Sequence, residues 1–263
     1  MFPRVDTMAY GDAPDQVGDL YLPDAEHPPV VCLLHGGYWR MPWGREHIAP
    51  LAVPLMRLGF AVWNLEYRRA RGARGELGST GGAWPGTLQD VAAGIDHLAI
   101  WAANGREGRV DLSRVSVVGH SAGGQLALWA AAPGGEYGPR RVPVAAVAGL
   151  APVADLEWAY RQRCGNGAVE NWLGGSPEEY PRRYREASPA ERLPLGVRQL
   201  VLHGTLDEDV PVDISRRYAR AAAAAGDAVS FTVLPDTQHM DFVDPASAAS
   251  ALLFDWLSRP AEE

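Results

Sequence analysis

Short runs of apolar residues alternate along the chain with longer segments of helical periodicity. Six runs are continuously apolar or β-branched, at residues 30–34, 60–65, 115–118, 144–148, 199–202 and 229–234. Continuous runs of this kind are typical of strands that are buried on both faces, as in a parallel sheet covered by helices. Helical periodicity between them predicts helices over residues 47–57, 87–103, 124–132, 213–225 and 245–257.

This alternation continues to the end of the chain. It predicts a three-layer α/β fold, in which a mostly parallel twisted sheet carries helices on both faces and the crossovers are right-handed. Another strand-like run, at residues 18–23, comes before the pattern and is expected to be one arm of an antiparallel starter pair. A length of 263 residues suits one α/β unit, so we expect a single domain over residues 1–263.

Two segments interrupt the alternation. Residues 68–86 are rich in Gly and Arg, and we expect a solvated surface loop there. Of its arginines, Arg68, Arg69, Arg71 and Arg74 are the alternative candidates for binding an acidic group. Residues 155–194 form a longer insertion, which is uncommon between two strands and often functional. We interpret this insertion as a small helical cap, with plain surface packing as the alternative.

Charge and composition exclude several classes of function. The chain has 24 basic and 32 acidic residues, a net charge of −8, so nothing recommends a nucleic acid as partner. All the basic residues are Arg, because the sequence contains no Lys. Schiff-base enzymes, Ser-Lys hydrolases and P-loop kinases need the ammonium group that Arg lacks.

The location of the protein is inferred from what the sequence lacks. The first twelve residues show no basic segment followed by an apolar run, and no apolar stretch is long enough to cross a bilayer. We therefore expect a cytoplasmic protein with no membrane partner. In a reducing compartment Cys32 and Cys164 are expected to remain free thiols.

The segment Gly119-His120-Ser121-Ala122-Gly123 fits the pattern Gly-x-Ser-x-Gly. It follows a predicted strand and precedes a predicted helix, which is the context that the pattern requires. The glycines permit a turn too tight for a β-carbon, and the turn holds the Ser in a strained conformation that exposes Oγ. Ser121 is therefore the candidate nucleophile.

A tetrahedral intermediate needs hydrogen-bond donors for its oxyanion. The segment His35-Gly36-Gly37-Tyr38-Trp39 follows the strand predicted at residues 30–34, and its glycines allow backbone N–H groups to approach a substrate. We assign Gly37, with Gly36 as a further candidate, to an oxyanion hole that the N–H of Ala122 completes.

A serine nucleophile needs a base, and the base needs a carboxylate that holds its tautomer. His239 is the candidate base, because it lies in a polar loop between the last predicted strand and the final helix. The other histidines are interpreted as structural groups or lie before the Ser motif or on helices: His27, His35, His47, His97, His120 and His203.

Three carboxylates are candidates for the acid. Asp207 follows the strand at residues 199–202 and is our choice. Asp209, in the same loop, is more typical of a cap for the helix that begins after Pro211. Asp155 is the third candidate, because it follows the strand at residues 144–148. The order Ser121, Asp207, His239 is the order expected of an α/β-hydrolase.

Four motifs of the sequence resemble those of a known family. They are His-Gly-Gly-Tyr-Trp at 35–39, Gly-His-Ser-Ala-Gly-Gly at 119–124, His-Gly-x-x-Asp at 203–207, and the late His239. Together they resemble the α/β-hydrolase esterases, in particular the branch of arylformamidases (kynurenine formamidases) and small carboxylesterases. The resemblance covers nearly the whole chain. It implies a serine hydrolase that cleaves a short-acyl carboxylic ester or an aryl formamide through an acyl-enzyme on Ser121.

The aromatic residues suggest the shape of the substrate. We expect Tyr38, Trp39, Trp158 and Trp172 to give the site flat apolar walls that suit a compact ring.

No zinc or dinucleotide signature is present, so we expect neither a metal nor a cofactor. The expected partner is a small-molecule ester or amide; the oligomeric state is open, with a homodimer as one option. The alternative function is a non-catalytic binding protein that retains the fold.

Overall fold

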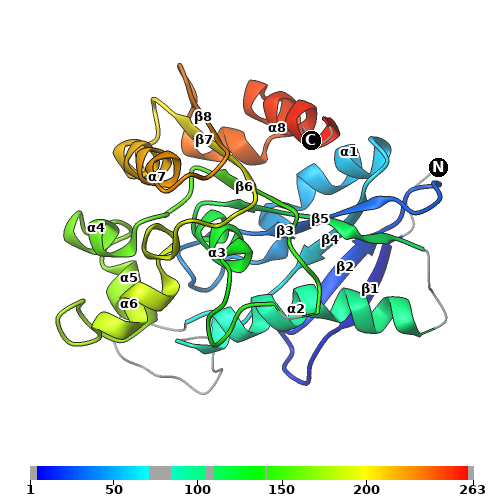
Figure 1. Cartoon of the computed structure of the whole chain (residues 1–263), viewed down its shortest axis with the longest axis horizontal. Helices are drawn as coiled ribbons and strands as arrows, with labels where there is room; N and C mark the ends of the chain where they lie inside the picture. The colour runs from blue at the N-terminus through cyan, green and yellow to red at the C-terminus, as the bar shows by residue number, and fades with distance from the viewer. Residues whose placement is uncertain (1–4, 71–83, 105–108, 140, 260–263) are drawn as a thin grey trace.

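The computed structural model describes residues 5–70, 84–104, 109–139 and 141–259. Within these residues eight strands form one sheet, in the order β1-β2-β4-β3-β5-β6-β7-β8 (Figure 1). The strands are β1 (Val5–Ala9), β2 (Val17–Tyr21), β3 (Pro29–Leu34), β4 (Ala61–Leu65), β5 (Asp111–His120), β6 (Ala146–Leu150), β7 (Arg198–Gly204) and β8 (Val229–Leu234). The prediction of a sheet with strands and helices in alternation is confirmed.

Strand pairing is parallel from β4 to β8 and antiparallel at the other edge. The first two strands pair antiparallel with each other, and β2 pairs antiparallel with β4, so the expected starter pair is present. The parallel strands end together at one edge of the sheet, with Leu34, Gly119, Gly149 and Val201 in register. Residues that follow these strands are therefore brought close to one another.

The helices flank the sheet. They are α1 (Ala52–Arg57), α2 (Gly86–Ala103), α3 (Ala122–Ala131), α7 (Asp213–Ala224) and α8 (Ala248–Ser258). One prediction was wrong in part: of the helix predicted over residues 47–57, only α1 is α-helical, after the 3-10 turns η1 (Arg45–His47) and η2 (Ala49–Leu51). Pro50 and Pro54 have no N–H to donate, which shortens the α-helix.

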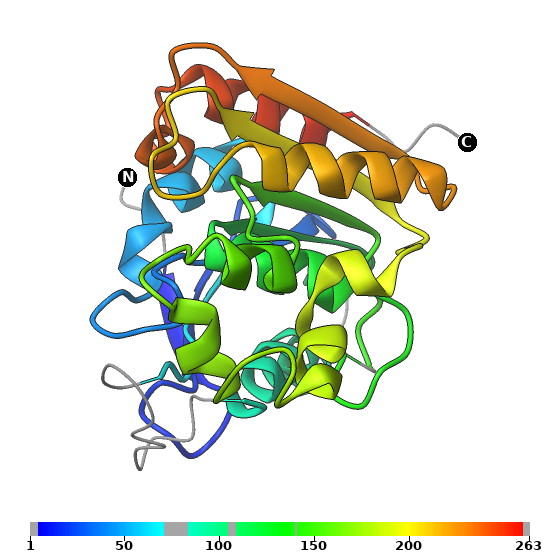
Figure 2. The ribbon, with the colours of Figure 1, turned by 90° about the vertical axis from the view of Figure 1, so that its left-hand side faces the viewer.

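Two hydrophobic clusters explain why the strands are continuously apolar. In β3, Val30, Cys32 and Leu34 point into one cluster with residues of α2, α3 and α7. Val31 and Leu33 point to the opposite face, where they pack with residues of α1 and α8. Successive side chains of a strand alternate between faces, so a strand covered on both sides must be apolar throughout. Figures 1 and 2 show these three layers.

The insertion at residues 155–194 is helical. It contains α4 (Leu156–Arg161), α5 (Ala168–Leu173), α6 (Pro181–Ala187) and the 3-10 turn η3 (Pro189–Arg192). These short helices gather beside α3 in Figure 2, and their buried side chains belong to the same cluster as those of α2 and α3. None of the helices in the described residues is both long and apolar enough to cross a membrane.

The Arg-rich segment differs from the expected solvated loop where the structure describes it. Arg68 makes two hydrogen bonds of 2.7 Å to the buried Asp90. Arg69 is 5% exposed and pairs with Asp15 at 3.1 Å. Both guanidinium groups therefore hold the fold together through acidic side chains that lie elsewhere in the sequence. Arg71 and Arg74 lie outside the described residues.

Candidate active site

Ser121 occupies a sharp turn between β5 and α3. Its backbone has φ 56° and ψ −119°, a region that non-glycine residues rarely adopt. A Cβ on Gly119 would lie 2.0 Å from the carbonyl oxygen of Gly123, and a Cβ on Gly123 would lie 2.1 Å from that of Leu34. The two glycines are therefore required by backbone packing, and the turn presents Ser121 at the carboxyl edge of the sheet.

Two backbone donors lie beside this turn without an internal acceptor. Among the described residues, no hydrogen bond uses the N–H of Gly37 or that of Ala122, the first residue of α3. Gly36 lies directly against the nucleophile, because a Cβ placed on it would be 3.1 Å from Ser121 Cβ. Free N–H groups at a helix N-terminus and in a glycine loop suit a developing negative charge.

His35 and Glu66 hold the glycine loop. His35 Nδ1 donates to the carbonyl oxygen of Gly36 at 2.7 Å, and its Nε2 lies 2.8 Å from Glu66 Oε1. Because a trans peptide places its N–H opposite its C=O, this bond directs the N–H of Gly37 away from His35. Glu66 also accepts from the N–H groups of Arg45 and Tyr67. One buried carboxylate thus fixes the loop that carries the candidate oxyanion donors.

The charge of Glu66 is stabilised in the folded state. Burial alone would raise the pKa of Glu66, but the hydrogen bond and charge of His35, the charge of Arg69 and the Arg45 N–H lower it below its usual value. A carboxyl group whose pKa is lower when folded contributes stability above its unfolded pKa, and that stability is lost as the pH falls. The stability carried by this charge is therefore greatest near neutral pH and lost in acid.

Replacing Glu66 with Gln tests this. We expect Glu66→Gln to lower the free energy of unfolding at pH 7 by about 1–3 kcal/mol, because Gln keeps the shape and loses the charge that the donors face. The difference from wild type should shrink as the pH falls below about 4.5, where the unfolded Glu66 takes up a proton. Urea unfolding at several pH values measures it, and a difference that stays constant with pH would contradict the role of the charge.

Asp207 and His239 meet at the same edge of the sheet. Asp207 lies in the loop after β7, and His239 opens the 3-10 turn η4 (His239–Val243) after β8. Asp207 Oδ2 and His239 Nδ1 are 2.7 Å apart, and the side chain of Asp207 is fully buried. Since the carboxylate accepts from Nδ1–H, His239 keeps Nε2 free to act as a base.

The surroundings keep Asp207 ionised. Burial would raise the pKa of Asp207, but hydrogen bonds from His203, His239 and the N–H of Val210 hold it well below its usual value. The N–H groups of Asp209 and Val210 both donate to Oδ1, at 3.0 and 2.8 Å. The carboxylate is thus fixed at one oxygen by backbone and offers the other to the two histidines.

The other two candidate acids have different positions. Asp155 is the N-cap of α4, where its side chain accepts from the N–H of Trp158 at 3.0 Å. Asp209 is exposed, and it does not cap α7, whose N-cap is Val212, so the expected capping role is corrected. Of the three carboxylates only Asp207 is hydrogen-bonded to His239.

Ser121 and His239 lie on adjoining loops without a direct bond. The hydrogen bonds of the described residues do not include one between Ser121 Oγ and His239 Nε2. Such bonds are often long in an enzyme without substrate and shorten in the Michaelis complex. The structure therefore brings the candidate base and the candidate acid into contact and the candidate nucleophile to the same edge.

Two cavities adjoin this edge. A groove of about 430 Å³ is lined by the loops after β7 and β8, including Asp207 and His239. A second cavity of about 480 Å³ shares Glu208 and Asp209 with the groove. Its other lining residues are Tyr38, Gln162, Arg163, Cys164, Gly165, Asn166 and Pro211. The loop between α4 and α5 thus forms a polar wall next to the acid and the base.

Tyr38 joins three parts of the site. Its hydroxyl donates to the carbonyl oxygen of Asp209 at 2.6 Å, which links the glycine loop to the loop of the acid. The loop between α4 and α5 covers its ring, because a Cβ on Gly165 would lie 2.5 Å from it. Four aromatic residues were expected to line the site. Of these, Tyr38 lines the cavity of about 480 Å³ beside the candidate acid and base.

Two of the three expected tryptophans, Trp39 and Trp172, do not form the flat walls expected of them. Trp39 and Trp172 are fully buried and stack on each other, with ring centroids 4.5 Å apart. Their indole nitrogens donate to Gln125 and Thr87 inside the protein. Trp158 is partly buried and packs against the main hydrophobic cluster. The assignment of Trp39 and Trp172 to substrate contact is therefore corrected, and they join the glycine loop to α5.

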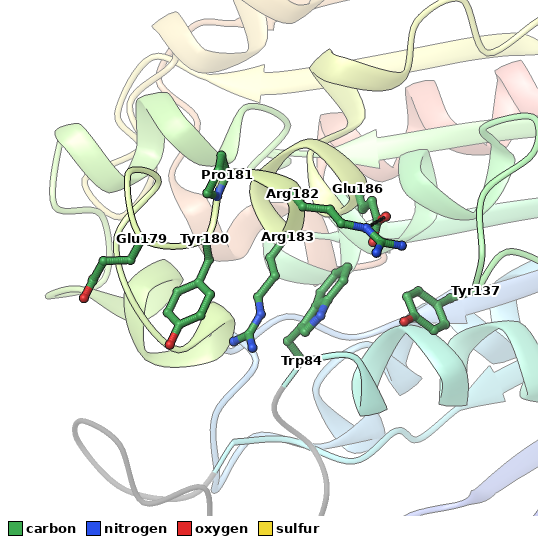
Figure 3. A pocket seen from close by; sticks show the side chains of 8 residues that line it. All are labelled: Trp84, Tyr137, Glu179, Tyr180, Pro181, Arg182, Arg183 and Glu186. Atoms are coloured by element: carbon green, nitrogen blue, oxygen red, sulfur yellow. Dashed lines mark hydrogen bonds and ion pairs between the residues drawn. The ribbon is translucent and has the colours of Figure 1, made fainter.

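An aromatic cavity of about 300 Å³ lies apart from the acid and the base. Figure 3 shows its lining, which includes Trp84, Tyr137 and Tyr180 together with the side chains of α6. The ring of Tyr137 meets that of Trp84 edge-on, and the guanidinium of Arg183 covers Tyr180. None of the candidate catalytic residues lines it.

One cluster in the described part of the chain has the composition of a metal site. Ligand atoms of Asp207, Asp209 and His239 lie within 4.8 Å of one another. The hydrogen bonds described above already use His239 Nδ1 and both oxygens of Asp207. We therefore interpret the cluster as an acid and base pair.

Sequence reasoning missed several residues of this edge. Glu66 was overlooked, although an acidic residue directly after a buried strand is a signal for a structural role in a loop. His120 is interpreted from the sequence as structural, and His47 is not chosen because it precedes the Ser motif, yet their rings form a hydrogen-bonded pair beside His239. Nothing in the local sequence shows that Gln162, Arg163 and Asn166 line a cavity, because their place depends on the fold of the insertion.

Known proteins support the fold. The BD-FAE family model matches residues 18–221. A truncated carbohydrate esterase from gut microbiota superposes with a TM-score of 0.77 at 22% identity, over 96% of this chain and 94% of that one. An acetyl ester-xyloside bifunctional hydrolase from Caldicellulosiruptor lactoaceticus gives a TM-score of 0.75 at 19% identity, over 97% and 96% of the two chains.

A third similar structure carries a small acid. It is an esterase from Thermogutta terrifontis with propionate bound, which gives a TM-score of 0.72 at 19% identity, over 96% of this chain and 91% of that one. A comparison with curated protein sequences gave no match. At these identities the structural likeness establishes the α/β-hydrolase fold alone.

Proposed function

The chain belongs to the BD-FAE family of α/β-hydrolase fold proteins, and from this premise we propose that it is a serine hydrolase. The observation that carries the proposal is the 2.7 Å contact of Asp207 with His239, at the edge where the strained turn presents Ser121. Nucleophile, base and acid thus follow β5, β8 and β7. These are the three roles that acyl transfer through a serine requires.

In the proposed mechanism, His239 Nε2 removes the proton of Ser121 Oγ as the oxygen attacks an acyl carbonyl. The N–H groups of Gly37 and Ala122 bind the oxyanion, with Gly36 giving the close approach, while Asp207 stabilises the imidazolium. His239 then donates the proton to the leaving group, which departs and leaves an acyl-enzyme. Water attacks the acyl-enzyme in the same way and regenerates Ser121.

We propose a short-acyl ester as the substrate. The names of the similar structures support this: one is a carbohydrate esterase, one hydrolyses an acetyl ester, and one binds propionate. The cavity beside the acid and base is lined by Gln162, Arg163, Asn166, Glu208 and Asp209, whose polar side chains suit a leaving group with several hydroxyl groups.

An aryl formamide is the second candidate substrate. It rests on the motif at residues 35–39, of which Tyr38 lines the cavity and Trp39 is buried.

We further propose that residues 155–194 act as a cap. Support comes from the loop between α4 and α5, which forms one wall of that cavity.

A substrate series separates these candidates. We expect kcat/KM for p-nitrophenyl esters to be highest from acetate to butyrate and to fall by about tenfold or more at octanoate, because each methylene that does not fit costs about 1–3 kcal/mol. N-formylkynurenine measured beside them tests the second candidate. A preference for the formamide by about two orders of magnitude would favour the arylformamidase assignment. Highest activity on long acyl chains would contradict both candidates.

The alternative is a binding protein that retains the fold without catalysis. A fluorophosphonate probe separates the two, since it reacts only with an activated serine. Labelling of wild type at Ser121 is expected, and an unlabelled wild-type protein would favour the binding protein.

A further inference from the structure

Two histidines outside the proposed triad lie against its base. His120, at the end of β5, is 1% exposed, and its ring centroid lies 4.5 Å from that of His239. Its Nε2 is 2.9 Å from the carbonyl oxygen of His239, and its Nδ1 is 3.0 Å from His47 Nε2. The rings of His47 and His120 stack with centroids 5.1 Å apart. The three imidazoles thus form one continuous contact.

These contacts determine where the protons lie. A carbonyl oxygen only accepts, so His120 Nε2 must carry the proton that it shares with His239 O. A neutral His120 then has a bare Nδ1, and this nitrogen must accept from the Nε2–H of His47. The chain of donors therefore runs in one direction, from His47 to His120 to the backbone of His239.

Both rings are uncharged near neutral pH. Burial, together with the neighbouring histidines, lowers the pKa of His120 well below its usual value. Burial and the charges of His35 and His239 lower the pKa of His47 to about 4. A neutral pair places no positive charge next to the base, which must itself become an imidazolium during the reaction.

We propose that His120 is a positioning residue for the catalytic base and that His47 fixes the tautomer in which His120 acts. This inference rests on the proposed function. Asp207 holds the ring of His239 at Nδ1, and His120 holds its main chain at the carbonyl oxygen. Since His120 precedes Ser121 in the chain, its side chain links the backbone of the nucleophile directly to that of the base.

The hydrogen bond from His120 matters because the hydrogen bond to Asp207 alone permits the ring of His239 to rotate. A ring bonded at Nδ1 alone can still pivot about the Asp207 contact and carry Nε2 away from Ser121. A displacement of about 1 Å from the reactive geometry can cost about a hundredfold in rate. Fixing the carbonyl oxygen restricts the main chain from which the ring projects.

Two substitutions of similar size test the role of His120. His120→Gln keeps an N–H donor close to the position of Nε2, whereas His120→Phe keeps a ring and removes the donor. We expect His120→Phe to lower kcat by about tenfold or more with KM within about twofold of wild type. We expect His120→Gln to remain within about threefold of wild type in kcat. Fluorophosphonate should label His120→Phe to the same final fraction as wild type, but more slowly.

A role in packing alone makes a different prediction. In that case any loss of kcat would be matched by an equal loss in the final labelled fraction, which counts folded sites. His120→Gln would then have no higher kcat than His120→Phe. Equal kcat per labelled site in the two variants would overturn the positioning role.

His47 supplies a second pair of variants if His120→Phe does not fold. His47 is only partly buried, so substitutions there disturb the core less. We expect kcat to be several-fold lower in His47→Phe, which has no donor, than in His47→Gln, which has one. Equal values would overturn the role of His47. A wild-type protein that fluorophosphonate does not label would overturn the proposed function itself, which keeps the two failures distinct.

Discussion

Turnover of short-acyl esters is expected to fall by at least about three orders of magnitude when Ser121 is replaced with Ala. The substitution removes the oxygen that attacks the acyl carbonyl, while the oxyanion donors and the cavities stay in place. KM should change little, because neither cavity depends on the hydroxyl. Steady-state kinetics on p-nitrophenyl acetate, at equal concentrations of folded wild-type and variant protein, measures the loss.

The Ser121→Ala variant must also fold if the loss of turnover is to be read as a loss of the nucleophile. Ser121 has a positive φ, but Ala has the same Cβ as Ser, so the strain of the turn is unchanged. The unfolding transition of Ser121→Ala should therefore match that of wild type within about 0.5 kcal/mol. Turnover in Ser121→Ala close to that of wild type would refute the assignment of the nucleophile.

Asp207→Asn is expected to lower kcat by about three to four orders of magnitude. Asn has the size of Asp, but its amide can present an N–H to His239 Nδ1, which favours the wrong tautomer of the base. Stability should fall by only about 1–2 kcal/mol, since the remaining oxygen still accepts from the N–H groups of Asp209 and Val210. Kinetics and urea unfolding on the same preparations separate the two effects.

The chain provides a matched control in Asp155→Asn. Asn is as good an N-cap as Asp, so α4 should keep its start and the enzyme its activity. If Asp155→Asn abolished turnover and Asp207→Asn did not, the acid would have been assigned to the wrong loop.

The sheet could be predicted from the sequence because burial on both faces leaves a local signature. Strands β3, β4 and β6 are buried almost throughout, and such a run is visible without knowledge of its neighbours. The expectation of burial on both faces was wrong for the edge strand β8, whose residues alternate between partly buried and exposed positions. The Ser motif was visible for the same reason, because the strand, turn and helix that define it are consecutive. Boundaries were less accurate where a strand continues through polar residues, as β5 does back to Asp111.

Contacts between residues distant in sequence could not be predicted where no motif marks them. His47 and His120 are 73 residues apart, and only the fold brings their nitrogens within 3.0 Å. Arg69 was expected in solvent because its neighbours in sequence are Gly and Arg, yet Asp15 pairs with it in the folded chain. Trp39 and Trp172 were expected at the surface of the site because aromatic residues suit ligands, but the same rings suit a core.

The stacked pair of Trp39 and Trp172 links two regions that would otherwise open independently. Proteins open locally in cooperative units, and the short helices of an insertion are candidates for the least stable of these. Here α5 contributes one indole of the pair, and the loop of the oxyanion donors contributes the other. An excursion that lifts α5 from the protein would expose the face of Trp39 on which Trp172 stacks, so opening of the insertion and of this loop are expected to be coupled. Under the proposed function, a substitution that weakens the docking of the insertion is therefore expected to lower activity even where it touches none of the proposed catalytic residues.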